Sequence, residues 1–164
     1  MIDPIEGEGV EERIRGLGEP AGVLQLLDRH QRGCEAFAER LGVPLHVVPV
    51  ALPETPFEVR PVLRNRLWAE VALWWPERRI LVCADVLGTL PYFRVGDEPV
   101  GLHPFLRLWP PRSLRGLRPE HLLVGHGRGL HGPGVAEAVE EALRTGQRRL
   151  PRWVVGLPKM ARRR

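Results

Sequence analysis

The 164-residue chain contains few cysteines, a single lysine and no long hydrophobic run. Its two cysteines, Cys34 and Cys83, lie in separate apolar stretches without the close spacing of a metal-binding cysteine motif. This excludes a disulfide scaffold and predicts buried, reduced thiols. No apolar run approaches membrane-spanning length, and no basic and apolar signal segment opens the chain. These absences predict a cytoplasmic protein that does not bind membranes.

The composition is that of an ordinary globular protein, with 43% hydrophobic and 27% charged residues. A chain of this length buries a substantial core, so we expect one domain over residues 1–164. The net charge is +4, lysine occurs only at Lys159, and a basic tail of residues 159–164 ends in three arginines. Such a tail attracts nucleic acid without specificity. A solvated terminus explains it more simply, and nucleic-acid binding is not expected because basic and aromatic residues do not interleave.

Helical and extended patterns alternate over the first fifty residues. Residues 8–17 carry apolar side chains at helical spacing, and residues 34–41 do the same before Gly42. Between and after these helices, residues 22–27 and 45–50 are predicted to be strands. This alternation is typical of layered α/β folds.

The later part of the chain predicts a hairpin, a long irregular stretch and a helical end. The hairpin is indicated by two apolar runs joined by four residues that include a proline. The predicted order is an extended piece at 57–59, hairpin strands at 69–75 and 80–84, loops with short helical turns over 87–119, a strand at 121–125, a glycine-rich turn to 134, a helix from 135 that ends at Gly146, and a short helix at 150–159.

Three predicted strand ends carry side chains that bind ligands in other proteins. Asp85 directly follows the apolar run at 80–84, and His126 follows the run at 122–125. His30 comes three residues after the predicted strand at 22–27. Because open α/β sheets place their ligands at the carboxyl ends of strands, we expect these three side chains to form a site.

The segment around His30 resembles a motif of the metallo-β-lactamase family, in which a strand ends in His-x-His-x-Asp-His before a small amphipathic helix. Here residues 28–32 are Asp-Arg-His-Gln-Arg, and the helix that follows ends in Arg-Leu-Gly-Val-Pro at 40–44. His30 matches the second histidine of that motif, and Asp28 stands in place of the first. The Asp-His pair has no equivalent among residues 31–33.

Two later segments extend the resemblance over most of the chain. Residues 70–85 are similar to the family hairpin that ends in the metal-bridging aspartate, which matches Asp85. Residues 122–127 resemble the family's terminal Gly-His-Gly element, which makes His126 its last metal ligand. The histidine expected before the hairpin falls near Asn65 or Arg66. The resemblance implies an α/β fold of the αββα sandwich type, with the N-terminal part of the first sheet shortened or missing.

The same resemblance implies four metal ligands, which are Asp28, His30, Asp85 and His126. Of these, Asp85 and His126 are the implied catalytic residues. The four groups hold at most one zinc, manganese or iron ion, and the loss of the other family ligands favours no ion at all. Three arginines near this position oppose a cation and suit an anionic ligand, namely Arg29, Arg32 and Arg66.

Each candidate side chain also has a structural interpretation. Asp85 can cap the turn that follows it, His126 can hold a turn between glycines, and His30 can pair with Asp28 or Asp85. Two functions therefore stay open. One is a divergent hydrolase, weakly active or inactive, that uses at most one metal ion. The other is a noncatalytic module for an anionic ligand or a protein partner, and its shortened sheet predicts a homodimer.

Overall fold

The computed structural model describes residues 1–31 and 33–161, with side chains up to residue 156. It is a mixed α/β structure whose main sheet has five strands. The basic tail at 159–164 therefore lies outside the described side chains. In chain order the elements are α1 (Val10–Leu17), β1 (Val23–Gln25), α2 (Cys34–Leu41), β2 (Leu45–Val47), β3 (Glu58–Arg64), β4 (Ala69–Trp75), β5 (Ile80–Cys83), β6 (Leu87–Gly88), β7 (Gly101–Leu102), the 3₁₀ turns η1 (Pro104–Arg107) and η2 (Arg112–Leu114), β8 (His121–Val124), β9 (Leu130–His131) and α3 (Val135–Ala161).

The N-terminal part alternates helix and strand as the sequence predicted. Strands β1 and β2 pair in parallel, and α2 ends at Gly42, which adopts the left-handed conformation. The predicted strand at 45–50 is shorter than expected because Val48 has a φ of 41°. A β-branched residue in that region cannot continue a strand. The chain therefore leaves β2 at Val47 and turns toward the main sheet.

The main sheet has the order β3-β4-β5-β8-β9. The predicted hairpin is confirmed, since β4 and β5 pair antiparallel across residues 76–79. Strand β8 then pairs in parallel with β5, in the register Ile80 with His121 and Cys83 with Val124. This parallel pairing brings the carboxyl ends of β5 and β8 to the same edge of the sheet, as the sequence predicted for Asp85 and His126.

The segment between β5 and β8 is irregular, as predicted, with helical turns η1 and η2 and a small β6–β7 ladder. The predicted helix end at Gly146 is wrong, because α3 runs without interruption to Ala161. A Cβ atom at Gly146 would lie 2.6 Å from a methyl carbon of Leu102. Glycine is therefore required here for close packing of the helix, and the residue does not end it.

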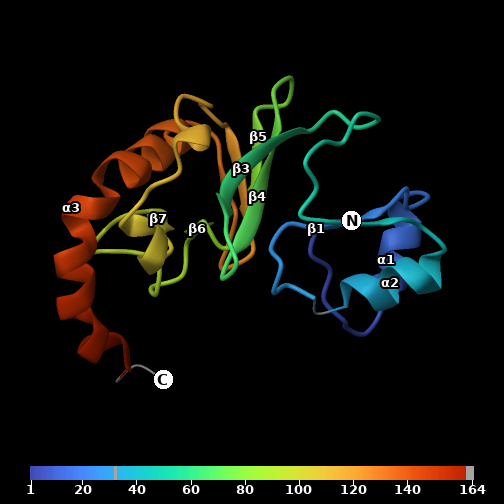
Figure 1. The fold of residues 1–164 in the computed structure, drawn as a ribbon, viewed down its shortest axis with the longest axis horizontal. Coiled ribbons are helices and arrows are strands. Elements are labelled where there is room, and N and C mark those ends of the chain that lie inside the picture. The colour runs from blue at the N-terminus through green and yellow to red at the C-terminus, as the bar shows by residue number, and fades with distance from the viewer. Residues whose placement is uncertain (32, 162–164) are drawn as a thin grey trace.

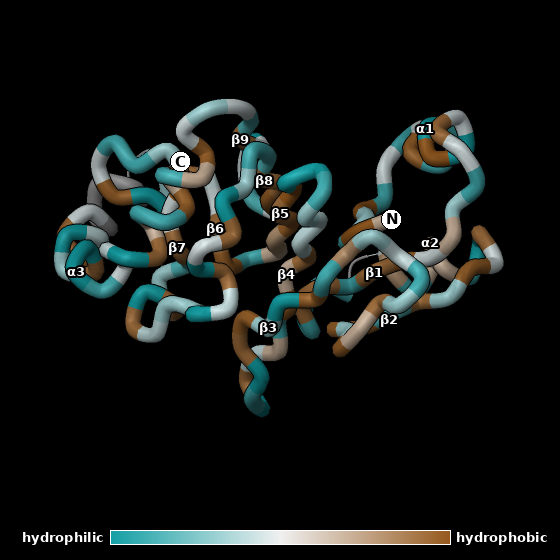
Figure 2. Tube along the Cα trace, turned by 90° about the horizontal axis from the view of Figure 1, so that it is seen from above, coloured by the Kyte–Doolittle hydropathy of each residue, from teal (hydrophilic) through white to brown (hydrophobic). Residues whose placement is uncertain are grey.

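The main sheet is covered on both faces at its strand β4. Figures 1 and 2 show the N-terminal elements on one side of the sheet and α3 on the other. Positions 70–74 of β4 are accordingly all buried, which is the pattern of a strand packed on both faces. The larger hydrophobic core lies at this sheet and includes Leu73, Leu81 and Leu143. Over the described part of the chain, no helix has the length and apolar character needed to cross a membrane.

Candidate metal centre

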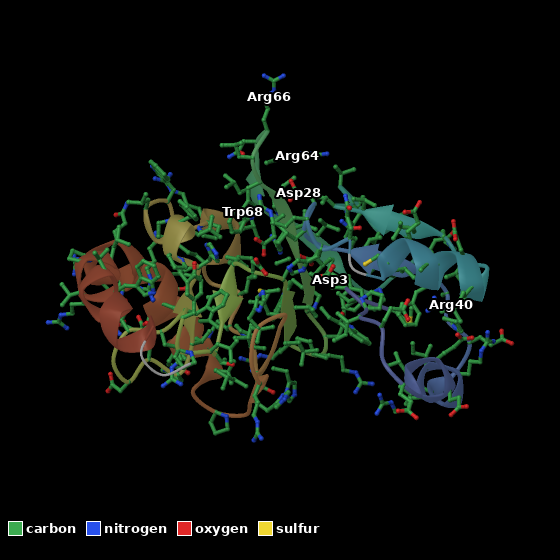
Figure 3. All side chains as sticks on the ribbon, turned by 90° about the horizontal axis from the view of Figure 1, so that it is seen from below. Asp3, Asp28, Arg40, Arg64, Arg66 and Trp68 are labelled. Carbon is green, nitrogen blue, oxygen red and sulfur yellow. The ribbon has the colours of Figure 1, made fainter. Side chains whose placement is uncertain are left out.

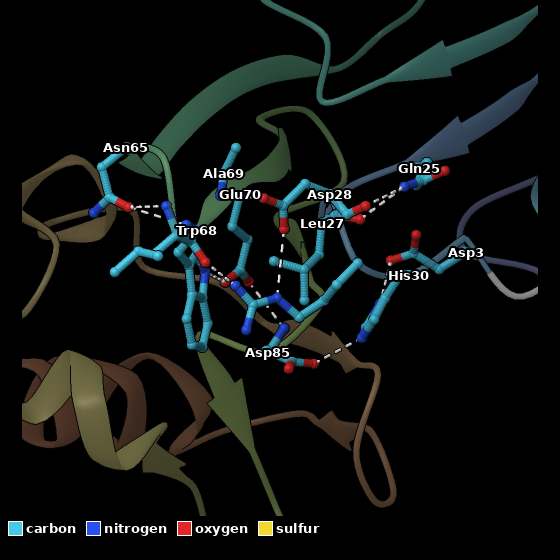
Figure 4. A network of polar contacts seen from close by, with 12 residues as sticks. Asp3, Gln25, Leu27, Asp28, His30, Asn65, Trp68, Ala69, Glu70 and Asp85 are labelled. Carbon is cyan, nitrogen blue, oxygen red and sulfur yellow. Dashed lines mark hydrogen bonds and ion pairs between the residues drawn. The ribbon is translucent and has the colours of Figure 1, made fainter.

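Asp85 lies just beyond the end of β5, in a turn that is held by a buried carboxylate. One oxygen of Glu70, Oε1, accepts hydrogen bonds from the backbone N–H of Asp85 at 2.9 Å and of Val86 at 2.8 Å. Its other oxygen accepts one from the indole of Trp68 at 2.9 Å (Figure 4). Burial raises the pKa of Glu70 to about 7, although these hydrogen bonds oppose the shift. Glu70 thus fixes the backbone from which the Asp85 side chain projects.

His30 reaches Asp85 from the loop after β1. Its Nε2 lies 3.0 Å from Asp85 Oδ1, and its Nδ1 lies 3.4 Å from an oxygen of Asp3 (Figure 4). The other oxygen of Asp3 accepts a hydrogen bond from the backbone of Leu26 at 3.0 Å. Asp3 therefore orients His30 in the way that a carboxylate orients a metal-binding histidine. The sequence offered no pattern that singled out Asp3.

His126 reaches the same oxygen from the loop between β8 and β9. Its Nε2 lies 2.9 Å from Asp85 Oδ1, and its ring stacks on Phe93 with a centroid distance of 5.5 Å. The glycines beside it are needed for this approach. A Cβ atom at Gly125 would lie 2.8 Å from the carbonyl oxygen of Ala84, and one at Gly127 would lie 2.1 Å from the hydroxyl of Thr89.

The three side chains converge on one point. One ligand atom from each of His30, Asp85 and His126 lies within 4.8 Å of the others. Asp85 Oδ1 is buried, yet it accepts no well-aligned hydrogen bond from either imidazole. Two ligands bound to one zinc ion at about 2.0–2.1 Å lie about 2.8–3.4 Å apart, for right-angled to tetrahedral geometry. The observed spacings of 2.9 and 3.0 Å match, so these residues fit a single metal ion.

The charges at the site depend on pH. Burial disfavours the charged imidazole of His30, but its close polar contacts with Asp3 and Asp85 and the attraction to their charges outweigh this and raise its pKa to about 9. Burial raises the pKa of the Asp85 carboxyl. The nearby imidazoles of His30 and His126 outweigh this effect, so the pKa of Asp85 lies below its usual value. Without a metal ion, the centre is therefore an imidazolium held between two carboxylates.

His103 lies beside this centre, although the sequence gave no reason to select it. Its ring packs against Trp68 at 4.7 Å and Phe93 at 5.7 Å between centroids. Burial lowers its pKa to about 4, so the imidazole is neutral at pH 7. Its buried Nδ1 has no hydrogen-bond partner among the described residues. His103 directly follows the two-residue strand β7, which lies in the stretch that the sequence predicts to be irregular, so no predicted strand end or local motif marked it.

The other predicted site residues do not join the cluster. Asp28, predicted as a ligand, accepts a hydrogen bond from the backbone of Ala69 at 3.0 Å and so serves to join the N-terminal part to β4. The guanidinium of Arg29 stacks over Trp68 at 4.7 Å. Arg66 is exposed at the tip of the β3–β4 turn and points away from the site (Figure 3). Arg32 lies outside the described residues.

No protein-family model and no curated protein matches the chain. Among solved structures, a crystal structure of the metallo-β-lactamase DIM-1 exposed to ceftazidime is similar, with a TM-score of 0.35 and 10% identity. The match covers 88% of this chain and 66% of that chain. This similarity is weak, and the function proposed below rests on the geometry of the site.

Proposed function

We propose that the protein is a divergent domain of the metallo-β-lactamase superfamily, an αββα sandwich with a shortened first sheet, that binds one divalent metal ion. The proposed ligands are His30, Asp85 and His126. The observation that carries the proposal is the buried Asp85 Oδ1, which faces two imidazole nitrogens at ligand spacing without a well-aligned hydrogen bond. The motif resemblance of the sequence supports the same three residues.

The proposed activity is weak hydrolysis. A bound zinc, manganese or iron ion supplies an acidified water molecule and polarises the bond to be cleaved. The chain provides only three protein ligands for it, and the proposed activity is accordingly at most mononuclear. Asp3 orients His30, Glu70 holds the turn of Asp85, and Phe93 covers one face of His126. The neutral imidazole of His103 lies beside this centre, and its buried Nδ1 has no hydrogen-bond partner among the described residues.

A noncatalytic role is the alternative, and one observation favours it. When His30 is protonated, which its raised pKa promotes, its positive charge already offsets one of the two carboxylates that contact it, Asp3 and Asp85. In that case the cluster joins the N-terminal part to the main sheet, and the protein is a binding or assembly module for an anionic ligand or a protein partner. Arg29, the only described arginine of the predicted anion set near the cluster, lies at its edge.

The metal content of the purified protein tests the first function. We expect Asp85→Asn and His126→Gln each to lose roughly one equivalent of zinc relative to the unsubstituted protein, by elemental analysis after equilibration and gel filtration. His46→Gln and Asp97→Asn alter an exposed histidine and an exposed aspartate elsewhere and should lose none. Binding near pH 7.5 should also release about one proton, because His30 must become neutral to ligate.

Two results would overturn the metal site. One is unchanged zinc uptake in both site variants, and the other is no uptake by any of the proteins while circular dichroism shows them folded. Confirmed uptake would justify hydrolysis assays with p-nitrophenyl acetate and bis-p-nitrophenyl phosphate. Uptake without hydrolysis of either probe would favour the noncatalytic alternative.

A further inference from the structure

A second pair of histidines lies at the base of the hairpin that carries His126. His121 begins β8, His131 ends β9, and the two residues face each other in the antiparallel register. Side chains of directly opposed residues project from the same face of a sheet. Accordingly, the two Nδ1 atoms lie 3.1 Å apart, and the ring centroids lie 5.3 Å apart.

The spacing of these nitrogens suits a shared metal ion. Two imidazole nitrogens at about 2.0–2.1 Å from one ion are about 2.8–3.0 Å apart at a right angle and about 3.3–3.4 Å apart in a tetrahedron. The observed 3.1 Å lies between these values. His121 is half-buried and His131 is exposed, so water has access to complete the coordination. The nearby carboxylate of Glu120 is already paired with Arg79.

The pair occupies a position where a crosslink has mechanical effect. Only two residue pairs hold β9 to β8, His121 with His131 and Leu122 with Leu130. Residues 125–129 between the strands include three glycines and carry His126 at their centre. One further backbone bond, from Gly132 N–H to the carbonyl of Glu120 at 2.9 Å, closes the hairpin. Within the loop, the backbone N–H of Thr89 donates to the carbonyl of His126 at 3.0 Å and its hydroxyl donates to that of Arg128 at 2.8 Å, and a crosslink at the base of the hairpin would add to these restraints.

We propose that His121 and His131 chelate a transition-metal ion that fastens the base of the hairpin carrying His126. Imidazole ligands select copper, nickel and zinc over magnesium and calcium, and affinity should be highest for Cu²⁺. The chelate does not require the cluster at Asp85 to bind metal. It does limit the movement of His126 and so acts on whatever that cluster does.

The test uses copper(II), zinc and magnesium ions with the full chain. We expect His131→Gln and His121→Gln each to weaken Cu²⁺ binding at this site at least about tenfold, because one imidazole is left. His46→Gln changes an exposed histidine of β2, in the N-terminal part, and is the matched control. Asp85→Asn should retain the site, which separates a failure here from a failure of the proposed metal centre. Isothermal titration calorimetry gives the affinities, and magnesium should not bind.

A second readout tests the mechanical role. Amide hydrogen exchange over residues 125–129 should slow when Cu²⁺ or Zn²⁺ is added, and this slowing should vanish in His131→Gln. Equal copper affinity in His131→Gln, His121→Gln and the unsubstituted protein would overturn the site. Binding that depends on both histidines without slower exchange would overturn the fastening of the hairpin.

Discussion

Two carboxylates in this protein, the partly buried Asp85 and the buried Glu98, differ in the groups that face them. Asp85 faces the imidazoles of His30 and His126 at 3.0 and 2.9 Å. Glu98 faces the guanidiniums of Arg107 and Arg149 at 2.9 and 3.0 Å. Arginine keeps its charge at every pH that proteins tolerate and does not ligate metals, whereas histidine titrates near neutrality and ligates readily.

The surroundings of the two carboxylates show what this difference means. Glu98 also accepts a hydrogen bond from the backbone of Val95 at 2.6 Å, and Arg107 donates one to the carbonyl of Phe93 at 2.6 Å. This network joins the segment at 93–98 to η1 and α3, and its charges are constant. The cluster at Asp85 changes its charge with pH, and its ligand atoms lie at the spacing of a metal centre. The network of Glu98, Arg107 and Arg149 is thus a fixed clamp, whereas the cluster of His30, Asp85 and His126 is a responsive site, whose charge depends on pH.

The largest expected loss of stability is that of Arg107→Met, which breaks the fixed clamp. Arg107 is fully buried, and its removal leaves the partly exposed Arg149 as the one cationic partner of the Glu98 carboxylate among the described residues. Breaking a buried ion pair from one side lowers the free energy of unfolding by about 3 kcal/mol or more. Urea unfolding at pH 7 measures the change.

A double variant separates the causes. Adding Glu98→Gln to Arg107→Met removes the uncompensated charge, and we expect it to recover about half of the lost stability or more. If the double variant is as unstable as Arg107→Met, the loss comes from packing of the arginine side chain and the fixed-charge interpretation is wrong.

The responsive site should give a pH effect of intermediate size. Because the pKa of His30 is raised from 6.5 to about 9 in the folded protein, its contribution to stability is complete below pH 6.5 and disappears as the pH rises through 9. We expect a loss of about 2 kcal/mol over this range, after allowance for solvent screening. The pKa of Glu70 is raised from 4.5 to about 7, so its effect on stability falls in a lower pH range than that of His30. Urea unfolding from pH 6 to 9.5 measures the slope.

Two variants sharpen this prediction. His30→Gln should abolish the slope between pH 7.5 and 9.5, whereas Arg107→Met should keep it and lower the whole curve. A slope that survives in His30→Gln would assign the titration to another group and would remove the basis for treating the Asp85 cluster as the responsive site.

The smallest expected effect is that of Arg149→Gln. Its side chain is 26% exposed, and it contacts Glu98 and Glu141 at 3.0 Å each. Ion pairs that water reaches contribute about 1 kcal/mol or less, so stability should fall by no more than that. A loss as large as that of Arg107→Met would show that Arg149, on α3, carries the clamp.

The candidate site was predictable in part. His30, Asp85 and His126 follow strand ends, and their convergence required only that β5 and β8 be parallel neighbours. Asp3 and Glu70 escaped prediction because nothing in their local sequence distinguishes a carboxylate that will be buried. Asp28 was predicted as a ligand by its place in a family motif. It instead accepts a hydrogen bond from the backbone N–H of Ala69 and does not join the cluster of His30, Asp85 and His126.

The sequence by itself determined the order of most helices and strands, because the periodicity of apolar residues and the positions of glycine act over a few residues. Only the tertiary structure decided which polar groups meet. Asp3 and His30 are 27 residues apart, and Asp85 contacts histidines from two further segments. The close packing of α3 at Gly146 likewise involves Leu102, which lies far away in the chain. Contacts at such separations depend on how the layers pack, which no local pattern records.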